Sequence, residues 1–96
     1  MQKLKKFDGG KVMLDLIDPQ FVVGLGEVLT IGAEKYGIDN WKQLDKSDIR
    51  RYKAAMLRHI YQYLSGEKKD AETGTSHLLH AATNIMFLEY FERNPK

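Results

Sequence analysis

The strongest constraint in the sequence is a long apolar run near its end that has no polar face. Between Leu78 and Phe91 most residues are apolar. Four polar residues interrupt the run: His80, Thr83, Asn84 and Glu89. A helix that is hydrophobic on all sides is normally buried. A chain of 96 residues offers little material to cover it, so we expect one face of this helix to meet another subunit in a homo-oligomer.

Capping signals delimit three helices, which we predict over residues 19–36, 46–65 and 76–93. Asp18 stands before a proline, and an Asp N-cap followed by Pro at the first helical position starts a helix. Asp45 is the corresponding N-cap of the second helix. A Thr-Ser pair caps the third helix, and Asn-Pro ends it. The predicted fold class is therefore all-α, with three main helices in a small bundle.

The first 17 residues are the least regular part of the single domain that we expect over residues 1–96. Gly9 and Gly10 signal a turn, because glycine tolerates positive φ. The apolar residues 12–17 fit either a short extended segment or a hydrophobic strap laid over the helices. We therefore predict an irregular N-terminal arm over residues 1–17.

Composition excludes several classes of protein. The chain has no cysteine, which rules out a disulfide scaffold, a thiolate zinc site and a Cys nucleophile. A net charge of +2, with both signs spread along the chain, is too small to predict nucleic-acid binding. No stretch approaches the ~20 apolar residues of a membrane span, and no apolar segment follows the basic start as in a signal peptide. We expect a cytoplasmic protein without a nucleic-acid or membrane partner.

Polar residues at helical spacing form one stripe on each predicted helix: Glu27 and Glu34; Arg51, Arg58 and His59; His77, His80 and Asn84. If the stripes converge, they surround one polar cleft. The arginine fork binds two oxygens at once, which suits phosphate. The alternatives are ordinary ones. The glutamates and arginines could be solvated surface charges, and the histidines could be hydrogen-bonded core residues instead of metal ligands.

Two further features favour a ligand site. An unpaired amide in an apolar helix costs about 1–3 kcal/mol, so Asn84 needs a buried partner or a ligand. The connector after the first helix is dense in polar and aromatic groups: Lys35, Tyr36, Asn40 and Trp41. Trp41 could stack on a base or simply close the core. Gly9-Gly10-Lys11 is a weak phosphate-binding signal, because the full P-loop pattern is absent.

Two short blocks, Lys6-x-Asp8-x-Gly10-Lys11 and Leu16-Ile17-x-Pro19, are followed by three longer blocks in a specific order. The longer blocks are Gly32-Ala33-Glu34-Lys35-Tyr36-Gly37-x-x-Asn40-Trp41, Arg51-Tyr52-x-Ala54-Ala55-x-x-Arg58-His59, and His77-Leu78-x-His80-Ala81-x-x-Asn84. Gly66-Glu67, Asp70 and Gly74 lie between the second and the third longer block. The series resembles the phage-associated dATP/dGTP diphosphohydrolase N-terminal domain family, over roughly residues 6–91.

The resemblance implies a helical domain that converts purine deoxynucleoside triphosphates to monophosphates and pyrophosphate. By analogy with all-α nucleotide pyrophosphohydrolases of the MazG type, carboxylates would hold Mg²⁺ or Mn²⁺, which positions the attacking water. The metal residues we assign on this basis are Glu27, Glu34 and Asp70. The catalytic residues are Glu34, Glu27, His77 and His80. The substrate-binding residues are Lys11, Lys35, Tyr36, Asn40, Trp41, Arg51, Arg58, His59 and Asn84.

The E-x-x-E and E-x-x-D motifs of MazG-type enzymes are absent from the predicted helices. Glu67 and Asp70, in the loop before the third helix, are spaced to supply acids instead. The shortage of carboxylates favours an alternative function, a non-catalytic nucleotide-binding protein that sequesters a nucleotide signal as a phage anti-defence sponge. A third reading is a helical interaction protein without a ligand, which requires every polar stripe to be solvated.

Overall fold

The computed structural model describes residues 8–95, and helices are the only regular elements in that range, which confirms the all-α class. The elements in chain order are the 3₁₀ helices Asp8–Gly10 (η1) and Leu14–Leu16 (η2), α1 (Pro19–Tyr36), the 3₁₀ helix Asn40–Gln43 (η3), α2 (Lys46–Leu64) and α3 (His77–Arg93). None of these helices is long and apolar enough to cross a membrane.

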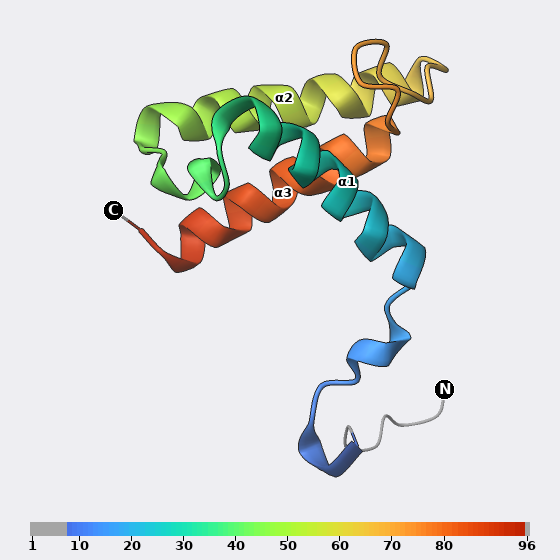
Figure 1. The fold of residues 1–96 in the computed structure, drawn as a ribbon, viewed down its shortest axis with the longest axis vertical. Coiled ribbons are helices and arrows are strands. Elements are labelled where there is room, and N and C mark those ends of the chain that lie inside the picture. The colour runs from blue at the N-terminus through green and yellow to red at the C-terminus, as the bar shows by residue number, and fades with distance from the viewer. Residues whose placement is uncertain (1–7, 96) are drawn as a thin grey trace.

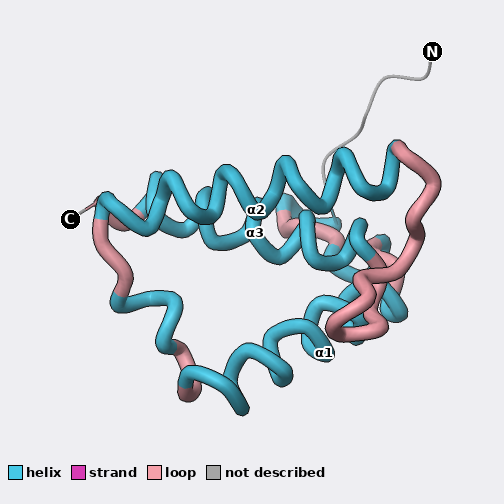
Figure 2. Tube along the Cα trace, turned by 90° about the horizontal axis from the view of Figure 1, so that it is seen from above, coloured by secondary structure: helices cyan, strands magenta, loops and turns pink. Residues whose placement is uncertain are grey.

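The helices form a pair and a crossing helix. α2 and α3 run side by side in opposite directions, joined by the loop 65–76 (Figure 1). α1 crosses α3 and then diverges from the pair, as the view from above shows (Figure 2). The connector that contains η3 closes the open end by leading back to α2. This V-shaped arrangement leaves the space between α1 and the other helices to be filled by side chains or by a ligand.

Side-chain caps set the helix starts. The Asp45 carboxylate accepts a hydrogen bond from the Ser47 backbone N–H at 2.9 Å, while Asp48 accepts one from the Asp45 N–H at 3.1 Å, which completes a capping box. Ser76 Oγ accepts from the Leu78 N–H at 3.1 Å at the start of α3. These bonds satisfy backbone donors that the helix itself leaves unpaired. The start of α3 is therefore held firmly, which matters for His77 at its first position.

The closest approach of α1 to α3 depends on a glycine. A Cβ added to Gly24 would lie 2.6 Å from Leu79 Cδ1, closer than two carbons can approach. Gly24 is buried, as are Val28 one turn later on α1 and Ala81 on the facing side of α3. The missing side chain thus leaves room for the Leu79 side chain of α3 to pack directly against the backbone of α1 at this crossing.

Aromatic residues of η3, α2 and α3 form a cluster at the end of the helix pair where the connector joins α2. Trp41, from η3, stacks on Phe87 with ring centroids 4.6 Å apart and meets the edge of Tyr90 at 4.9 Å. Tyr52 of α2 lies 4.9 Å from the Phe87 ring. Offset and edge-on aromatic pairs of this kind stabilise beyond their buried area. Trp41 therefore takes part in the packing that joins the connector to α2 and α3.

The N-terminal arm differs from both sequence-based alternatives for residues 12–17. It contains the short 3₁₀ helix η2, and it projects away from the three helices instead of lying over them (Figure 1). Val12, Leu14 and Leu16 are each about 70% exposed. An extended segment would need a neighbouring strand to pair with, and the described residues contain no sheet. Residues 1–7 of the predicted arm lie outside the described range.

The glycine crossing leads to a stability prediction. Gly24→Ala and Gly26→Ala change positions two residues apart on α1, and both replace glycine by a better helix former, worth about 0.5–1 kcal/mol. Gly26 has open space where the methyl would go, whereas at Gly24 the Leu79 side chain must move. We expect Gly26→Ala to raise the free energy of unfolding in urea and Gly24→Ala to gain nothing or to lose stability. Equal stabilisation by both changes would contradict close helix contact at Gly24.

Candidate functional site

A cavity of about 690 Å³ lies between α1 and the α2–α3 pair. Its walls come from the C-terminal half of α1, the connector to η3 and the facing side of α3. Small-molecule sites in proteins usually measure about 300–1,000 Å³. Two lining residues, His80 and Phe87, are seven apart on α3 and so lie on one face about 10 Å apart. The cavity is therefore long enough to hold a nucleotide-sized molecule along α3.

The two ends of the cavity differ in chemistry. One end is aromatic, with Trp41, Tyr52 and Phe87. The other end is polar, where His80 Nε2 lies 2.8 Å from Thr73 Oγ1 and both residues line the wall. Such a cavity offers an apolar surface for a ring at one end and hydrogen-bonding groups for a polar group at the other.

All three histidines of the chain gather beyond the polar end. His59, from α2, is 6% exposed, and His77, the first residue of α3, is fully buried. Their Nδ1 atoms are 2.9 Å apart, and the His59 ring also stacks on His80 at 4.6 Å with an angle of 11°. His77 Nε2 lies 2.7 Å from Glu67 Oε1.

The hydrogen bonds determine the histidine tautomers. A carboxylate can only accept, so His77 Nε2 must carry the proton that it donates to Glu67. Neutral His77 then has a lone pair on Nδ1, which accepts a hydrogen bond from His59 Nδ1–H. A continuous chain of hydrogen bonds thus runs from α2 through the start of α3 to the loop.

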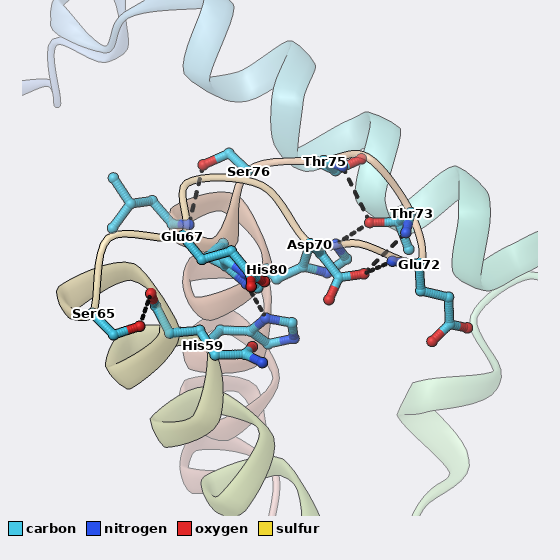
Figure 3. Close-up of polar contacts among 12 residues, drawn as sticks. His59, Ser65, Glu67, Asp70, Glu72, Thr73, Thr75, Ser76 and His80 are labelled. Carbon is cyan, nitrogen blue, oxygen red and sulfur yellow. Dashed lines mark hydrogen bonds and ion pairs between the residues drawn. The ribbon is translucent and has the colours of Figure 1, made fainter.

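The loop 65–76 brings an acid to this cluster. Asp70 Oδ2 accepts hydrogen bonds from the backbone N–H groups of Glu72 at 3.1 Å and Thr73 at 2.9 Å (Figure 3). The Asp70 N–H donates to the Thr75 carbonyl at 2.9 Å, and the His77 N–H donates to the Lys68 carbonyl at 3.0 Å. These bonds hold the loop at both ends, so Asp70 has a defined position although it is not on a helix.

Burial changes the acid–base properties of the cluster. The pKa of His59 is lowered to about 4, chiefly by desolvation on burial and to a lesser extent by the positive charges possible on His80, Arg58 and His77. Desolvation also lowers the pKa of His80. For Asp70, desolvation raises the pKa, but hydrogen bonds from Thr73 and the nearby His80 and His59 outweigh it, so the pKa lies below the usual value. At neutral pH the site thus combines the neutral imidazoles of His59 and His80 with the ionised carboxylate of Asp70.

Several predicted site residues come together here. His59, His77 and Asp70 each offer a ligand atom, and these three atoms lie within 4.8 Å of one another. Among the described residues 8–95 this is the group of acids and histidines that could hold a metal ion. The remaining predicted residues at the site line the cavity beside it: Lys35, Tyr36, Asn40, Trp41, His80 and Asn84. Asn84 donates to the His80 carbonyl at 2.9 Å, so its amide has a partner within α3.

Other predicted residues lie elsewhere. Glu27 and Glu34 are exposed on α1 and do not belong to the His59–Asp70–His77 group. The Arg51 side chain is 82% exposed and pairs with Asp48 at 3.4 Å. Arg58 is exposed, yet close enough to lower the pKa of His59. Lys11 lies exposed on the projecting arm.

Sequence reasoning missed two kinds of contributor. Thr73 is hydrogen-bonded to Asp70 through its backbone N–H and to His80 through its hydroxyl. It lies in a charged loop, where no sequence pattern marks it as a site residue. Phe87 lines the cavity and packs on Trp41, and from sequence it is one apolar residue among many in α3. Its position seven residues after His80 is the one signal that places it on the same face.

The fold and site define an all-α domain with a histidine–carboxylate cluster beside a ligand-sized, partly aromatic cavity. The profile of the family described as "dATP/dGTP diphosphohydrolase, N-terminal" matches residues 1–96, so the chain belongs to this family, as its motifs indicated. The chain is also similar to a protein of Salmonella phage PMBT28 named "dATP/dGTP diphosphohydrolase", with 42% identity over 89 residues. The match covers 93% of this chain but only 30% of that relative. No solved structure matches the chain significantly.

The buried neutral imidazole leads to a pH prediction for the protein in EDTA. The pKa of His59 is about 4 in the folded state against 6.5 ordinarily, so the unfolded state binds more protons between these values. The contribution of the neutral His59 to the free energy of unfolding is therefore fully present above about pH 6.5, and it is lost as the pH drops toward 4. Urea unfolding at pH 7 and pH 5 should show this loss, in part also from His80. His59→Gln should reduce the difference between the two pH values, and an unchanged difference would contradict burial of a neutral His59.

Proposed function

We propose that this domain forms the nucleotide site of a metal-dependent pyrophosphohydrolase that converts a purine dNTP to the dNMP and pyrophosphate. The observation that carries the proposal is the cavity with an aromatic end and a polar end beside the histidine–carboxylate cluster. Family membership and the printed name of the phage relative support this substrate class. The chain spans about 30% of that relative's length, so the activity of the complete protein is part of the proposal.

The purine would occupy the aromatic end. Stacking of a base on an aromatic side chain contributes about 1–3 kcal/mol in nucleic-acid complexes. Trp41 is positioned for this by its own packing against Phe87, which removes the cost of ordering the ring on binding. Asn40, next to it in the cavity wall, offers an amide to the base edge.

The triphosphate would then extend toward the polar end. Lys35 lines the cavity and is held 3.0 Å from Glu72, and this hydrogen bond raises the Lys35 pKa. Arg58 adds positive charge near the histidines. Water would attack the α-phosphorus, breaking its bond to the bridging oxygen and releasing pyrophosphate. A divalent ion, when bound, would neutralise the triphosphate. Neutral His80, which lines this end, is suited to accept the proton of the water.

One observation favours the binding-only alternative. Among the residues that line the cavity, Asp39 is the only one with a carboxylate side chain. A protein that sequesters a nucleotide needs the aromatic wall and the cations, but no acid near the phosphates. The two functions therefore make the same prediction for binding and opposite predictions for turnover.

Intrinsic fluorescence and product analysis test the proposal together. Trp41 is the only tryptophan and lines the cavity, so dGTP or dATP should change its emission. With Mn²⁺ or Mg²⁺ present, chromatography should detect dGMP or dAMP and pyrophosphate. His80→Gln should lower kcat by about 100-fold or more while the fluorescence response persists.

Glu92→Gln, an exposed change outside the cavity, is the control and should leave the rate unchanged. Glu34→Gln tests the assigned role of that residue in turnover. An emission change without product would support sequestration and overturn hydrolysis. Neither response, with a folded protein, would overturn both functions.

We also propose that the functional unit is a homo-oligomer. Apolar side chains of the arm and of the first turns of α1 are exposed: Val12, Leu14, Leu16, Ile17, Phe21, Val22 and Val23. The radius of gyration is 15.9 Å, whereas a compact chain of this length measures about 12–13 Å. A projecting apolar arm is suited to packing on a second copy of the same chain, as in domain-swapped dimers.

Light scattering after size exclusion tests this assembly. The wild-type chain should have at least twice the mass of 11.1 kDa. The double change Leu14→Asp and Leu16→Asp should yield the monomer, because it places charges in the apolar strip. Leu64→Asp, at an exposed leucine on the end of α2, should leave the assembly intact. A wild-type monomer would contradict the proposal.

A further inference from the structure

We propose that His59, Asp70 and His77 form the metal centre, and that it takes a transition-metal ion such as Mn²⁺, Co²⁺ or Zn²⁺ in preference to Mg²⁺. The inference rests on the proposed function for the role of the metal, but the site itself is argued from the contacts among these residues. It replaces the exposed α1 glutamates with two buried histidines and a half-buried aspartate, which come from α2, the start of α3 and the loop between them.

The distances suit a shared ion. The Nδ1 atoms of His59 and His77 are 2.9 Å apart. One ligand atom from each of His59, Asp70 and His77 lies within 4.8 Å of the other two. Nitrogens that bind one tetrahedral zinc ion at about 2.0–2.1 Å lie about 3.3 Å apart, so the two rings would have to separate by only a few tenths of an ångström. The ion would take the place of the His59–His77 hydrogen bond, with the His59 proton moving to its Nε2. Little movement of the backbone is required, because both histidines already point their Nδ1 atoms at one place.

The outer contacts have the arrangement found around metal ligands. A metal-binding histidine usually donates its second N–H to a carboxylate or a carbonyl, which orients the ring and raises its basicity. His77 does this through Nε2–H to Glu67 at 2.7 Å. Asp70 is likewise oriented by two backbone N–H donors on Oδ2. Glu67 is thus a positioning residue that keeps the His77 Nδ1 lone pair available.

The donor set determines the class of ion. Two imidazole nitrogens and one carboxylate oxygen suit zinc, cobalt, manganese or iron, whereas Mg²⁺ prefers an all-oxygen shell. Three protein ligands leave positions open for water or a phosphate oxygen, as in catalytic sites. The polar end of the cavity adjoins this cluster, since His80 lines the cavity and stacks on His59. A bound ion would therefore stand at the end where the triphosphate is placed.

Metal binding by the EDTA-treated chain tests this assignment directly. Equilibrium dialysis against Zn²⁺, Mn²⁺, Co²⁺ and Mg²⁺ should show one transition-metal ion per chain and much weaker Mg²⁺ binding. The Co²⁺ form should show visible d–d absorption that depends on histidine ligation. His59→Gln and Asp70→Asn should abolish stoichiometric binding, and Glu67→Gln should weaken it by about 10–100-fold.

Two control variants change residues that lie close to the proposed metal ligands. Glu72→Gln removes a carboxylate from the same loop, and His80→Gln removes the imidazole stacked on His59, so both should bind metal as the wild type does. Circular dichroism verifies folding. If His59→Gln does not fold, the Co²⁺ spectrum of the wild type and the Asp70→Asn variant decide. No stoichiometric metal, equal Mg²⁺ affinity or equal loss in the controls would overturn the site.

The outcome is separable from that of the proposed function. Tight metal binding without nucleotide turnover would keep this site and reject hydrolysis. Turnover with Mg²⁺ that survives Asp70→Asn would keep hydrolysis and reject this site.

Discussion

A hydrogen-bonded chain from the buried His59 and His77 to Glu67 at the surface is the constraint on which the site depends. It joins α2, the first residue of α3 and the loop between them, which are the segments that a two-helix hairpin must hold in register. Buried polar groups of this kind are costly unless every partner is in place. Within the same loop, Asp70 is held separately by the backbone N–H groups of Glu72 and Thr73.

The cavity has a different origin. α1 is held against α3 near Gly24, where the absence of a side chain permits close contact, and it diverges beyond that point. The aromatic residues around Trp41 close the far end by tying the connector to α2 and α3. A cavity forms because the helices meet at these two places and the side chains between them do not fill the space.

The histidine network and the cavity give the two ends of the site different chemistry, which family membership alone does not specify. The aromatic end suits a base, the cationic and polar end suits phosphates, and the buried histidine–carboxylate group adjoins the phosphate end. In the proposed function, the acids for phosphoryl chemistry therefore need not lie on the helices. They can come from a loop, provided that hydrogen bonds fix it as they fix Asp70.

The sequence by itself determined the local elements and their chemistry. Caps at Asp18, Asp45 and Ser76 act within a few residues, so their effect on helix starts is legible without tertiary contacts. The ordered blocks of polar residues likewise indicated the family. Helical periodicity placed His77, His80 and Asn84 on one face of α3, because that relation depends only on helix geometry.

Only the tertiary structure decided which stripes converge. Glu27 and Glu34 have the same seven-residue spacing as His80 and Phe87, yet the packing of α1 leaves the glutamates exposed, while His80 and Phe87 line the cavity. The pairing of His59 with His77, 18 residues away, follows from how α2 packs on α3. The position of the arm also could not be predicted from its apolar residues. Such residues indicate that a segment tends to be buried, but not against which surface it packs. Spacing along one helix is local, whereas the orientation of a face depends on packing between segments distant in the chain.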